Sequence, residues 1–340
     1  MADFAIIGGG IVGVMTAREV AAREPGSIIT VLERDAIGQG ASRRSAGLHW
    51  PFGATPRLRA MTAYSQRYYA ALAHDDPGLP IHALDAHVHA SAADRLRAIT
   101  LDEANLRKAS GNWRVDGCQY ADVRGLAEAL ADALRPQVTF REGTQVTAID
   151  SGPDGVGVEL GTGERLYADR VVLTPGPWIA APAWRNLLAP LRLRIKKIVA
   201  LHVDLGPDAD AGLAVFADDD AFLLPIAEHG YQLFSYTRDE WDVDPDALHG
   251  SVSPADIAAG RACLRRHVPE LADAAMSGRV FCDAYSPNRE PVVRAMDGAG
   301  RVVFAGAASG SGYRLAPAIA AEAVDVLTSR EGVARDHQYV

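Results

Sequence analysis

Cysteine is scarce in this sequence, and no run of hydrophobic residues is long enough to cross a membrane. The three cysteines, Cys118, Cys263 and Cys282, lie far apart and form no CxxC pair, which argues against a disulfide framework, a zinc site or a redox motif. The uncharged stretch 4–17 has 14 residues, four of them glycine, whereas a spanning helix needs about 20 apolar residues. The N-terminus lacks the basic cluster and cleavage site of a signal peptide, so we expect a cytoplasmic protein with no membrane partner.

The sequence also has no excess of positive charge and no long basic run. It carries 34 Lys and Arg against 43 Asp and Glu, a formal net charge of −9. Nucleic acid and anionic membranes are therefore poor candidates as partners. Hydrophobic residues make up 48% and charged residues 23%, an ordinary globular composition that excludes a disordered chain. The length of 340 residues favours two lobes.

A strand–helix–strand unit is predicted at the N-terminal end. Residues 4–8 form a short apolar run that ends in glycine, as a buried strand does. A helix is expected over 11–23, ended by the Pro-Gly pair that follows it, and residues 28–33 form a second apolar strand. Because the connections are short, the two strands should be parallel with a right-handed crossover.

The rest of the chain differs between its middle and its ends. Further helices are expected at 57–73, 123–134, 255–267 and 315–327, and further strands at 82–91, 138–141, 145–149, 155–160, 165–173, 195–205, 221–225, 231–236 and 302–305. The middle strands should form an antiparallel set, whereas the strand–helix character returns at the C-terminal end. We predict a discontinuous nucleotide-binding lobe (1–75, 121–180 and 291–340) with a second lobe (76–120 and 181–290) inserted into it.

Three glycines between the first strand and the first helix match G-x-G-x-x-G. They are Gly8, Gly10 and Gly13, and Glu33 ends the next strand 20 residues after Gly13. In this context the pattern indicates a dinucleotide site, with Gly10 admitting a pyrophosphate to the helix N-terminus and Glu33 accepting from ribose hydroxyls. The alternative is an ordinary glycine-rich turn with a solvated Glu33. Only one such fingerprint occurs, so we expect one dinucleotide and no second domain that supplies electrons from NAD(P)H.

Several motifs together resemble the D-amino acid oxidase superfamily, in particular its glycine oxidase and sarcosine oxidase branches. The opening is similar at 6–13, 31–34 and 40–47, the middle at 174–178 and 222–237, and the C-terminal part at 302–317. The region 76–120 matches poorly. The resemblance implies a two-lobe α/β (α+β) fold, with a Rossmann-like FAD-binding lobe and an inserted antiparallel-sheet substrate lobe.

The resemblance also implies which residues bind the cofactor, FAD. They are Gly8, Gly10, Ile11, Val12, Gly13, Glu33, Arg34, Ser42 and Arg43 toward the adenosine and pyrophosphate, Ala46, Gly47 and Leu48 beside the flavin edge, Val146 at the adenine, Gly176 in the middle motif, and Gly306, Gly310, Gly312, Tyr313 and Arg314 around the flavin C2 carbonyl. A helix that starts near Arg314 would direct its positive end at the flavin N1–C2=O region. We expect FAD to be noncovalent; a covalent link to Cys282 is the alternative.

On the substrate side, the resemblance implies an arginine that holds a carboxylate, because a planar fork matches two carboxylate oxygens. Arg289 lies where that arginine is expected; the alternative is a surface arginine paired with Glu290. Tyr236 is a hydroxyl partner from the facing strand or a core tyrosine, and His49 either shapes the pocket or only packs in its loop. The lysine that activates oxygen in sarcosine-oxidase-like members is absent from strand 231–236. His82, His87 and His89 lie near one another, but no Cys or carboxylate completes a metal set, so we expect surface histidines and no metal.

The resemblance thus implies an FAD-dependent oxidoreductase that oxidises the C–N bond of an amino acid or N-substituted glycine-like amine to an imine. The expected partners are an amine substrate with a carboxylate and an electron acceptor, oxygen giving hydrogen peroxide or another acceptor. One alternative is an FAD-dependent 2-hydroxy-acid dehydrogenase, which needs a base, with His49 as the candidate. Another is a noncatalytic FAD-binding module. The exact amine, its chirality and the oligomeric state stay open.

Overall fold

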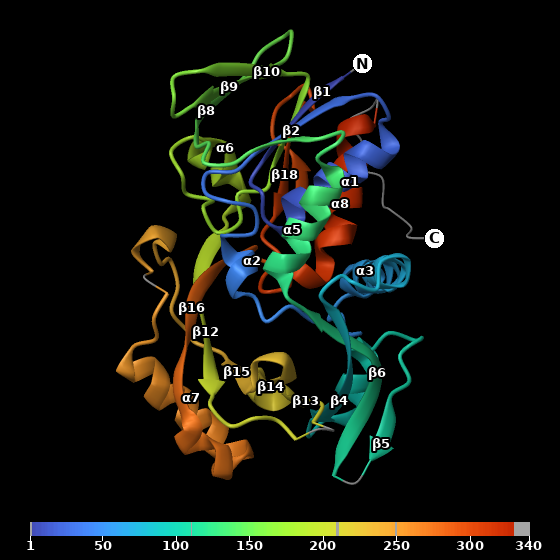
Figure 1. Cartoon of the computed structure of the whole chain (residues 1–340), viewed down its shortest axis with the longest axis vertical. Coiled ribbons are helices and arrows are strands. Elements are labelled where there is room, and N and C mark those ends of the chain that lie inside the picture. Colours follow the sequence, from blue (N-terminus) through green and yellow to red (C-terminus); the bar gives the residue numbers. More distant parts are fainter. Residues whose placement is uncertain (1, 110, 209–210, 249, 330–340) are drawn as a thin grey trace.

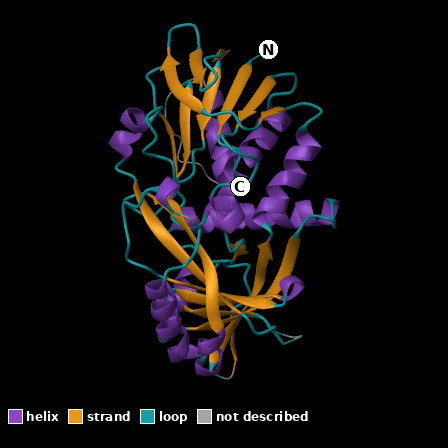
Figure 2. Ribbon diagram, turned by 60° about the vertical axis from the view of Figure 1, so that its left-hand side comes forward, coloured by secondary structure: helices purple, strands orange, loops and turns teal. Residues whose placement is uncertain are grey.

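The computed structural model describes residues 2–109, 111–208, 211–248 and 250–329. Both ends of the predicted nucleotide-binding lobe (residues 1 and 330–340) and positions 110, 209–210 and 249 of the predicted inserted lobe lie outside the described residues. The described helices are α1 (Ile11–Arg23), α2 (Ala41–Arg44), α3 (Pro56–Asp75), α4 (Ala93–Ile99), α5 (Val123–Leu134), α6 (Arg185–Leu188), α7 (Pro254–His267) and α8 (Gly312–Thr328). The two strand-rich regions lie at opposite ends of the molecule with helices between them (Figure 2).

The upper region in Figure 1 is built on a six-stranded sheet. Its order is β17 (Val292–Ala295), β18 (Val302–Gly306), β11 (Arg170–Leu173), β1 (Asp3–Ile7), β2 (Ile28–Leu32) and β7 (Thr139–Arg141). All neighbours are parallel except β17 and β18. The predicted strand–helix–strand unit is therefore confirmed, and segments from both ends and the middle of the chain meet in one sheet.

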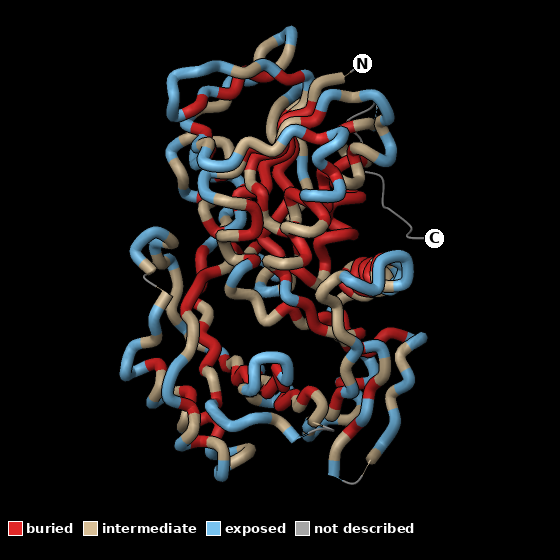
Figure 3. Tube along the Cα trace, in the orientation of Figure 1, coloured by how far each residue is buried: buried red, intermediate tan, exposed pale blue. Residues whose placement is uncertain are grey.

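The strands of this sheet are buried on both faces, which explains their continuous apolar sequences. On β1, Phe4 and Ile6 face α1 and α8 and belong to their apolar core. Ala5 and Ile7 face the opposite side, where a three-stranded antiparallel sheet covers them. That sheet consists of β8 (Val146–Ser151), β9 (Val156–Leu160) and β10 (Arg165–Ala168), in a region where strands were predicted at 145–149, 155–160 and 165–173. Buried residues are concentrated in this upper region (Figure 3).

The lower region is a nine-stranded sheet, antiparallel except where β13 pairs with β4. Its main path is β16 (Ala275–Tyr285), β12 (Arg194–Val203), β15 (Tyr231–Tyr236), β14 (Ala221–Ile226), β13 (Leu213–Phe216), β4 (Ile81–His89), β6 (Asn112–Ala121) and β3 (Leu48–His49), and β5 (Arg107–Ala109) pairs with β6. The antiparallel set expected from the middle of the chain is present. Helix α7 packs against β12, β15 and β16.

Two long strands of the lower sheet, β6 and β16, were not predicted from the sequence. β6 pairs with β3, β4 and β5, and β16 pairs with β12 along its whole length. The sequence of β16 has no clean alternation, and its Gly278 is required because a Cβ there would lie 2.5 Å from the carbonyl oxygen of Ala200. At the C-terminal end of β16, Tyr285 forms an isolated β-bridge with Ala308, which follows β18 in the chain. This strand therefore joins the two regions.

Within the described residues, no helix is long and apolar enough to cross a membrane.

A candidate dinucleotide and substrate site

One large cavity of about 880 Å³ lies between the two sheets. It is lined by the turn after β1, by α2, by the loop after β11, by β12 and β14–β16, and by the loop between β18 and α8. Most of the predicted site residues line it: Gly8, Gly10, Ile11, Val12, Glu33, Arg34, Ser42, Ala46, Leu48, Val146, Gly176, Gly306, Gly310, Gly312, Tyr313 and Arg314 for the cofactor, and Tyr236 and Arg289 for the substrate. Gly13, Arg43, Gly47 and His49 do not.

The turn between β1 and α1 is built on close backbone contacts. Gly8 has φ +109°, and a Cβ there would lie 2.3 Å from the carbonyl oxygen of Thr174. Gly13 lies behind the turn, where a Cβ would come within 1.9 Å of the Gly8 carbonyl oxygen. Gly13 therefore allows α1 to pack closely against β1, as the pattern predicts, and it does not line the cavity.

The start of α1 faces the cavity with two polar side chains beside it. The Glu33 carboxylate accepts hydrogen bonds from the backbone N–H groups of Gly9 (2.7 Å) and Asp35 (2.9 Å). Burial raises the pKa of Glu33, against the lowering effect of these bonds. Ser42 of α2 accepts from the Ile11 N–H at 3.0 Å. Each oxygen retains a lone pair for a hydroxyl donor, so this corner fits a ribose next to a helix N-terminus.

The two arginines predicted for the pyrophosphate are placed differently. Arg34 lines the cavity, lies 4.1 Å from the Trp178 ring centroid and pairs with Asp246 at 2.7 Å. Arg43 lines a second cavity of about 500 Å³, where it bonds to Gln39 at 3.1 Å. The structure therefore brings Arg34 to the predicted site and turns Arg43 away from it.

The loop between β18 and α8 is strained and carries polar atoms without partners. Ala307 and Ser309 have φ +52° and +51°, unusual for residues other than glycine. Within the described residues, Ser309 Oγ and Arg314 Nε are buried without a hydrogen-bond partner. Burial lowers the pKa of Arg314 to about 10. Buried unpaired donors are costly, so their clustering in this wall fits a polar ligand group such as the pyrimidine edge of a flavin.

Two residues near α2 and β3, Gly47 and His49, support the site from behind the cavity wall. Gly47 has φ +64°, and a Cβ there would lie 2.0 Å from the Ala121 carbonyl oxygen. His49 is fully buried with its ring edge toward Tyr69, at 6.0 Å between centroids. Burial and the nearby charge of Arg314 lower the pKa of His49 to about 3. His49 is thus neutral at ordinary pH and away from the cavity, which is not the placement of a base that reaches substrate.

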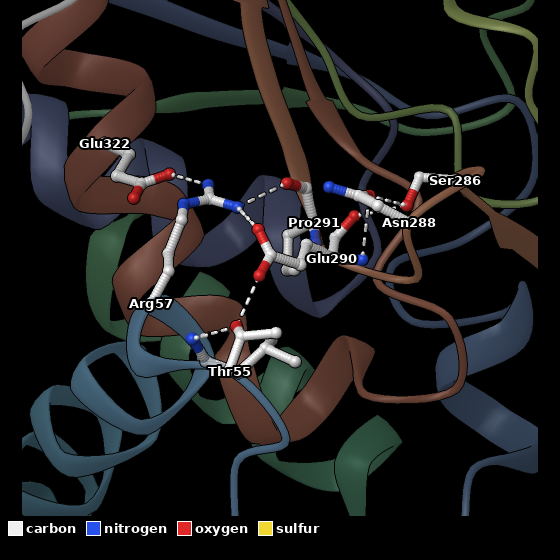
Figure 4. Close-up of polar contacts among 8 residues, drawn as sticks. Thr55, Arg57, Ser286, Asn288, Glu290, Pro291 and Glu322 are labelled. Atoms are coloured by element: carbon white, nitrogen blue, oxygen red, sulfur yellow. Dashed lines mark hydrogen bonds and ion pairs between the residues drawn. The ribbon is translucent and has the colours of Figure 1, made fainter.

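Arg289 lies in a tight turn between β16 and β17 and lines the cavity. Its φ of +62° is left-handed, and among the described residues its guanidinium forms no hydrogen bond or ion pair. The carboxylate of Glu290, its alternative partner, points elsewhere: it accepts from the Thr55 hydroxyl and pairs with Arg57 at 3.3 Å (Figure 4). The turn therefore separates the two side chains and leaves the arginine facing the cavity.

The turn that carries Arg289 is anchored from both sides (Figure 4). Ser286 donates to the Glu290 carbonyl oxygen at 2.6 Å, and the Glu290 N–H donates to the Asn288 side chain at 3.1 Å. Arg57 of α3 donates to the Pro291 carbonyl oxygen at 2.9 Å and pairs with Glu322 of α8 at 2.6 Å. Such fixed surroundings can hold a residue in a left-handed conformation.

Tyr236 also lines the cavity, but its hydroxyl donates to the Asp256 carbonyl oxygen of α7 at 2.5 Å. Burial raises the pKa of Tyr236 well above its usual range, so the proton stays on this bond. Of the two roles left open for Tyr236, this geometry favours the core tyrosine, because its ring is buried at the cavity wall and its hydroxyl ties β15 to α7.

Sequence reasoning missed the contribution of β12 and β16. Lys196 of β12 and Phe281, Asp283 and Tyr285 of β16 line the cavity. Cys282 faces the other side of the strand and lines the second cavity; burial raises the pKa of its thiol to about 12. The alternation of Phe281, Asp283 and Tyr285 was the available signal, but it identifies a cavity wall only once β16 is known to be a strand.

One group of side chains outside the cavity has metal-ligand chemistry. Asp219, Cys263 and His267 have potential ligand atoms within 4.8 Å of one another. Arg266 lies 3.0 Å from Asp219 and 3.4 Å from the Cys263 sulfur, and His267 lies 2.6 Å from Asp219. A guanidinium in this position already supplies the positive charge that Asp219 requires.

Comparisons with known proteins agree with this geometry. The "uncharacterized oxidoreductase YurR" of Bacillus subtilis (strain 168) is 25% identical over 371 residues, covering 97% of this chain and 96% of that protein. Glycine oxidase from Geobacillus kaustophilus superposes with a TM-score of 0.79 at 19% identity, covering 99% of this chain and 97% of its own. L-proline dehydrogenase from P. horikoshii gives 0.80 at 16%, covering 96% and 93%. The predicted two-lobe fold is thus confirmed.

The family is shown by a match that spans nearly the whole chain. The sequence model described as "FAD dependent oxidoreductase" matches residues 3–326, from the first strand to the last turns of α8. The resemblance seen in the sequence motifs is confirmed, and the noncatalytic alternative is not carried further. The protein therefore belongs to the family of FAD-dependent oxidoreductases and is an enzyme that uses FAD.

Proposed function

We propose that this enzyme oxidises the C–N bond of an amine that carries a carboxylate, such as an amino acid or an N-substituted glycine. The observation that carries the proposal is the unpaired guanidinium of Arg289, held by an anchored left-handed turn at the cavity. A guanidinium matches both oxygens of a carboxylate with two parallel hydrogen bonds. A substrate carboxylate would pair with the Arg289 guanidinium, which the turn leaves without a partner among the described residues.

The remaining roles follow from position in the cavity. The turn after β1, Glu33 and Ser42 would hold the adenosine and pyrophosphate of FAD, and the loop before α8 would hold the flavin edge. When bound, FAD supplies a two-electron acceptor. Arg289 would fix the substrate so that its reacting carbon is oriented, and the apolar walls from β14 and β15 would exclude water. The product imine would hydrolyse to an oxo acid and an amine or ammonia.

We propose oxygen as the electron acceptor, reduced to hydrogen peroxide. The lysine associated with oxygen activation is absent from β15, but Lys196 of the neighbouring strand β12 lines the same cavity. The dehydrogenase of 2-hydroxy acids is less favoured, because such a reaction needs a base and His49 is buried, neutral and outside the cavity wall.

Anaerobic reduction of the flavin tests the proposal. The FAD-loaded enzyme is mixed with D- and L-amino acids, glycine, N-methylglycine, their decarboxylated analogues and matching 2-hydroxy acids. We expect bleaching of the flavin by at least one amino acid and little by its decarboxylated analogue. Readmission of air should restore the colour and release hydrogen peroxide. Reduction by hydroxy acids alone, or equally by amines without a carboxylate, would overturn the proposal.

A further inference from the structure

Asp283 is a carboxylate in the cavity wall that the proposed function does not yet use. It lies on β16 between Phe281 and Tyr285, on the face of the strand that lines the cavity. If Gly310 carried a Cβ, that atom would lie 3.9 Å from the Asp283 Oδ2 and 3.3 Å from the Tyr285 hydroxyl oxygen. Asp283 is therefore next to the loop where the flavin edge is expected.

No group in the described residues forms a hydrogen bond or ion pair with the Asp283 carboxylate. Lys196 of β12 is its direct partner in register, but the Lys196 ammonium lies over the rings of Trp241 (5.2 Å) and Tyr285 (5.7 Å). Burial raises the pKa of Asp283 to about 6, with no opposing charge among its causes. Asp283 is half-buried and lines the cavity, so its carboxylate, which has no partner among the described residues, is open to a donor from a ligand.

Charges of opposite sign act on Tyr285, which lines the same cavity. Burial raises the pKa of Tyr285 well above its usual range, the negative charge of Asp283 raises it further, and the positive charge of Arg289 lowers it. Tyr285 is thus within the electrostatic reach of both groups. The other charged groups nearby are Asp220, which lines the same cavity, and Arg44 of α2, which acts on Cys282 on the far face of β16.

We propose that Asp283 binds the amino group of the substrate while Arg289 binds its carboxylate. This inference rests on the proposed function and makes it more specific. A carboxylate accepts hydrogen bonds from an amine N–H in either protonation state, and a carboxylate and a guanidinium that line the same cavity match the two charges of an amino acid. The pair also favours amino acids over 2-hydroxy acids, because an ammonium group carries a positive charge opposite Asp283 and a hydroxyl group does not.

The test uses two ligands that differ only in the amino group. 2-Aminoisobutyrate has no hydrogen on its α-carbon and so cannot lose one to the flavin, and isobutyrate has the same carbon skeleton without the amine. Both are titrated into FAD-loaded wild-type enzyme and Asp283→Asn, with the visible flavin spectrum as the readout. Asp116→Asn is the matched control, because Asp116 pairs with Arg107 on the surface at 2.8 Å. FAD content is measured in every variant.

We expect Asp283→Asn to weaken 2-aminoisobutyrate binding about 10- to 100-fold, the range for a hydrogen bond to a charged group. Isobutyrate should bind equally well or more tightly, because a repelling charge is removed. In the wild type, 2-aminoisobutyrate binding should fall as the pH drops through about 6, since Asp283 then becomes neutral. This pH dependence needs no variant, and Asp283→Asn should abolish it.

Two results would overturn the role of Asp283 alone: an unchanged 2-aminoisobutyrate affinity in Asp283→Asn, or an equal loss for both ligands. A wild-type affinity that does not depend on pH between 5 and 7 would do the same. Failure of the proposed function is a different result, in which neither ligand perturbs the flavin of the wild type. In that case the carboxylate anchor at Arg289 fails together with the inference drawn from it.

Discussion

The two ends of the cavity differ in the kinds of residue that line them. At the end formed by β1, α1 and the loop before α8, the wall is rich in glycines and residues with left-handed backbone. At the end formed by β12, β15 and β16, the wall includes charged and aromatic side chains from paired strands. The first end should therefore tolerate little added volume, whereas the second should respond to side-chain chemistry.

The largest effect is expected where backbone packs against backbone. A Cβ at Gly13 would lie 1.9 Å from the Gly8 carbonyl oxygen, so Gly13→Ala must push α1 away from β1. We expect a loss of about 3 kcal/mol in the free energy of unfolding, with loss of bound FAD. Gly298→Ala is the control, because nothing lies within 4 Å of a Cβ there. Thermal unfolding and flavin content measure both; equal stability of the two variants would contradict the packing argument.

The next effect is expected at the side-chain end. Arg289→Ala should lower kcat/KM for an amino acid about a thousandfold, or about 4 kcal/mol, because orientation and affinity are lost together. Arg289→Lys should recover only part of this loss. FAD content should not change in either variant.

Arg294→Ala is the matched control for Arg289, since Arg294 is exposed on β17 and does not line the cavity. Steady-state kinetics with an amino acid and its decarboxylated analogue decide the question. An Arg289→Ala enzyme that still prefers the carboxylated substrate would show that the anchor lies elsewhere.

A smaller effect is expected for a side chain at the glycine-rich end. Glu33→Ala removes the carboxylate that holds the Gly9 N–H at 2.7 Å and faces the cavity. We expect FAD affinity to fall by about 1.5–3 kcal/mol, roughly 10- to 100-fold, without loss of the fold. Flavin release on dilution measures the affinity, and Glu103→Ala, an exposed change outside the cavity, is the control. Equal FAD affinity in the two variants would mean that Glu33 has no part in binding.

The smallest effect is expected at Cys282, which lies on β16 but faces away from the large cavity. Cys282→Ala should leave flavin content unchanged, and acid precipitation of the wild type should release all FAD into the supernatant. A pellet that keeps its flavin fluorescence in the wild type and loses it in the variant would show a covalent link.

The glycine-rich end could be predicted almost completely from the sequence. Gly8, Gly10, Gly13 and Glu33 lie where the strand–turn–helix pattern puts them, because the geometry of a tight turn is decided by neighbours along the chain. The resemblance of the C-terminal motif also led to the loop before α8, whose helix begins at Gly312. Arg43 and His49 were placed in the cavity only by analogy, and the structure turns one to the surface and buries the other.

The amino-acid sequence by itself determined the spacing of the glycines and the parallel strands of the first unit, and its resemblance to a known family indicated Arg289 ahead of the strand at 302–305. Only the tertiary structure decided which side chains share the substrate end. Lys196 and Asp283 are far apart in the chain, yet they are direct partners across β12 and β16. Their pairing depends on the register of two strands and on the burial of one face, which are properties of long-range packing that no local pattern of residues encodes.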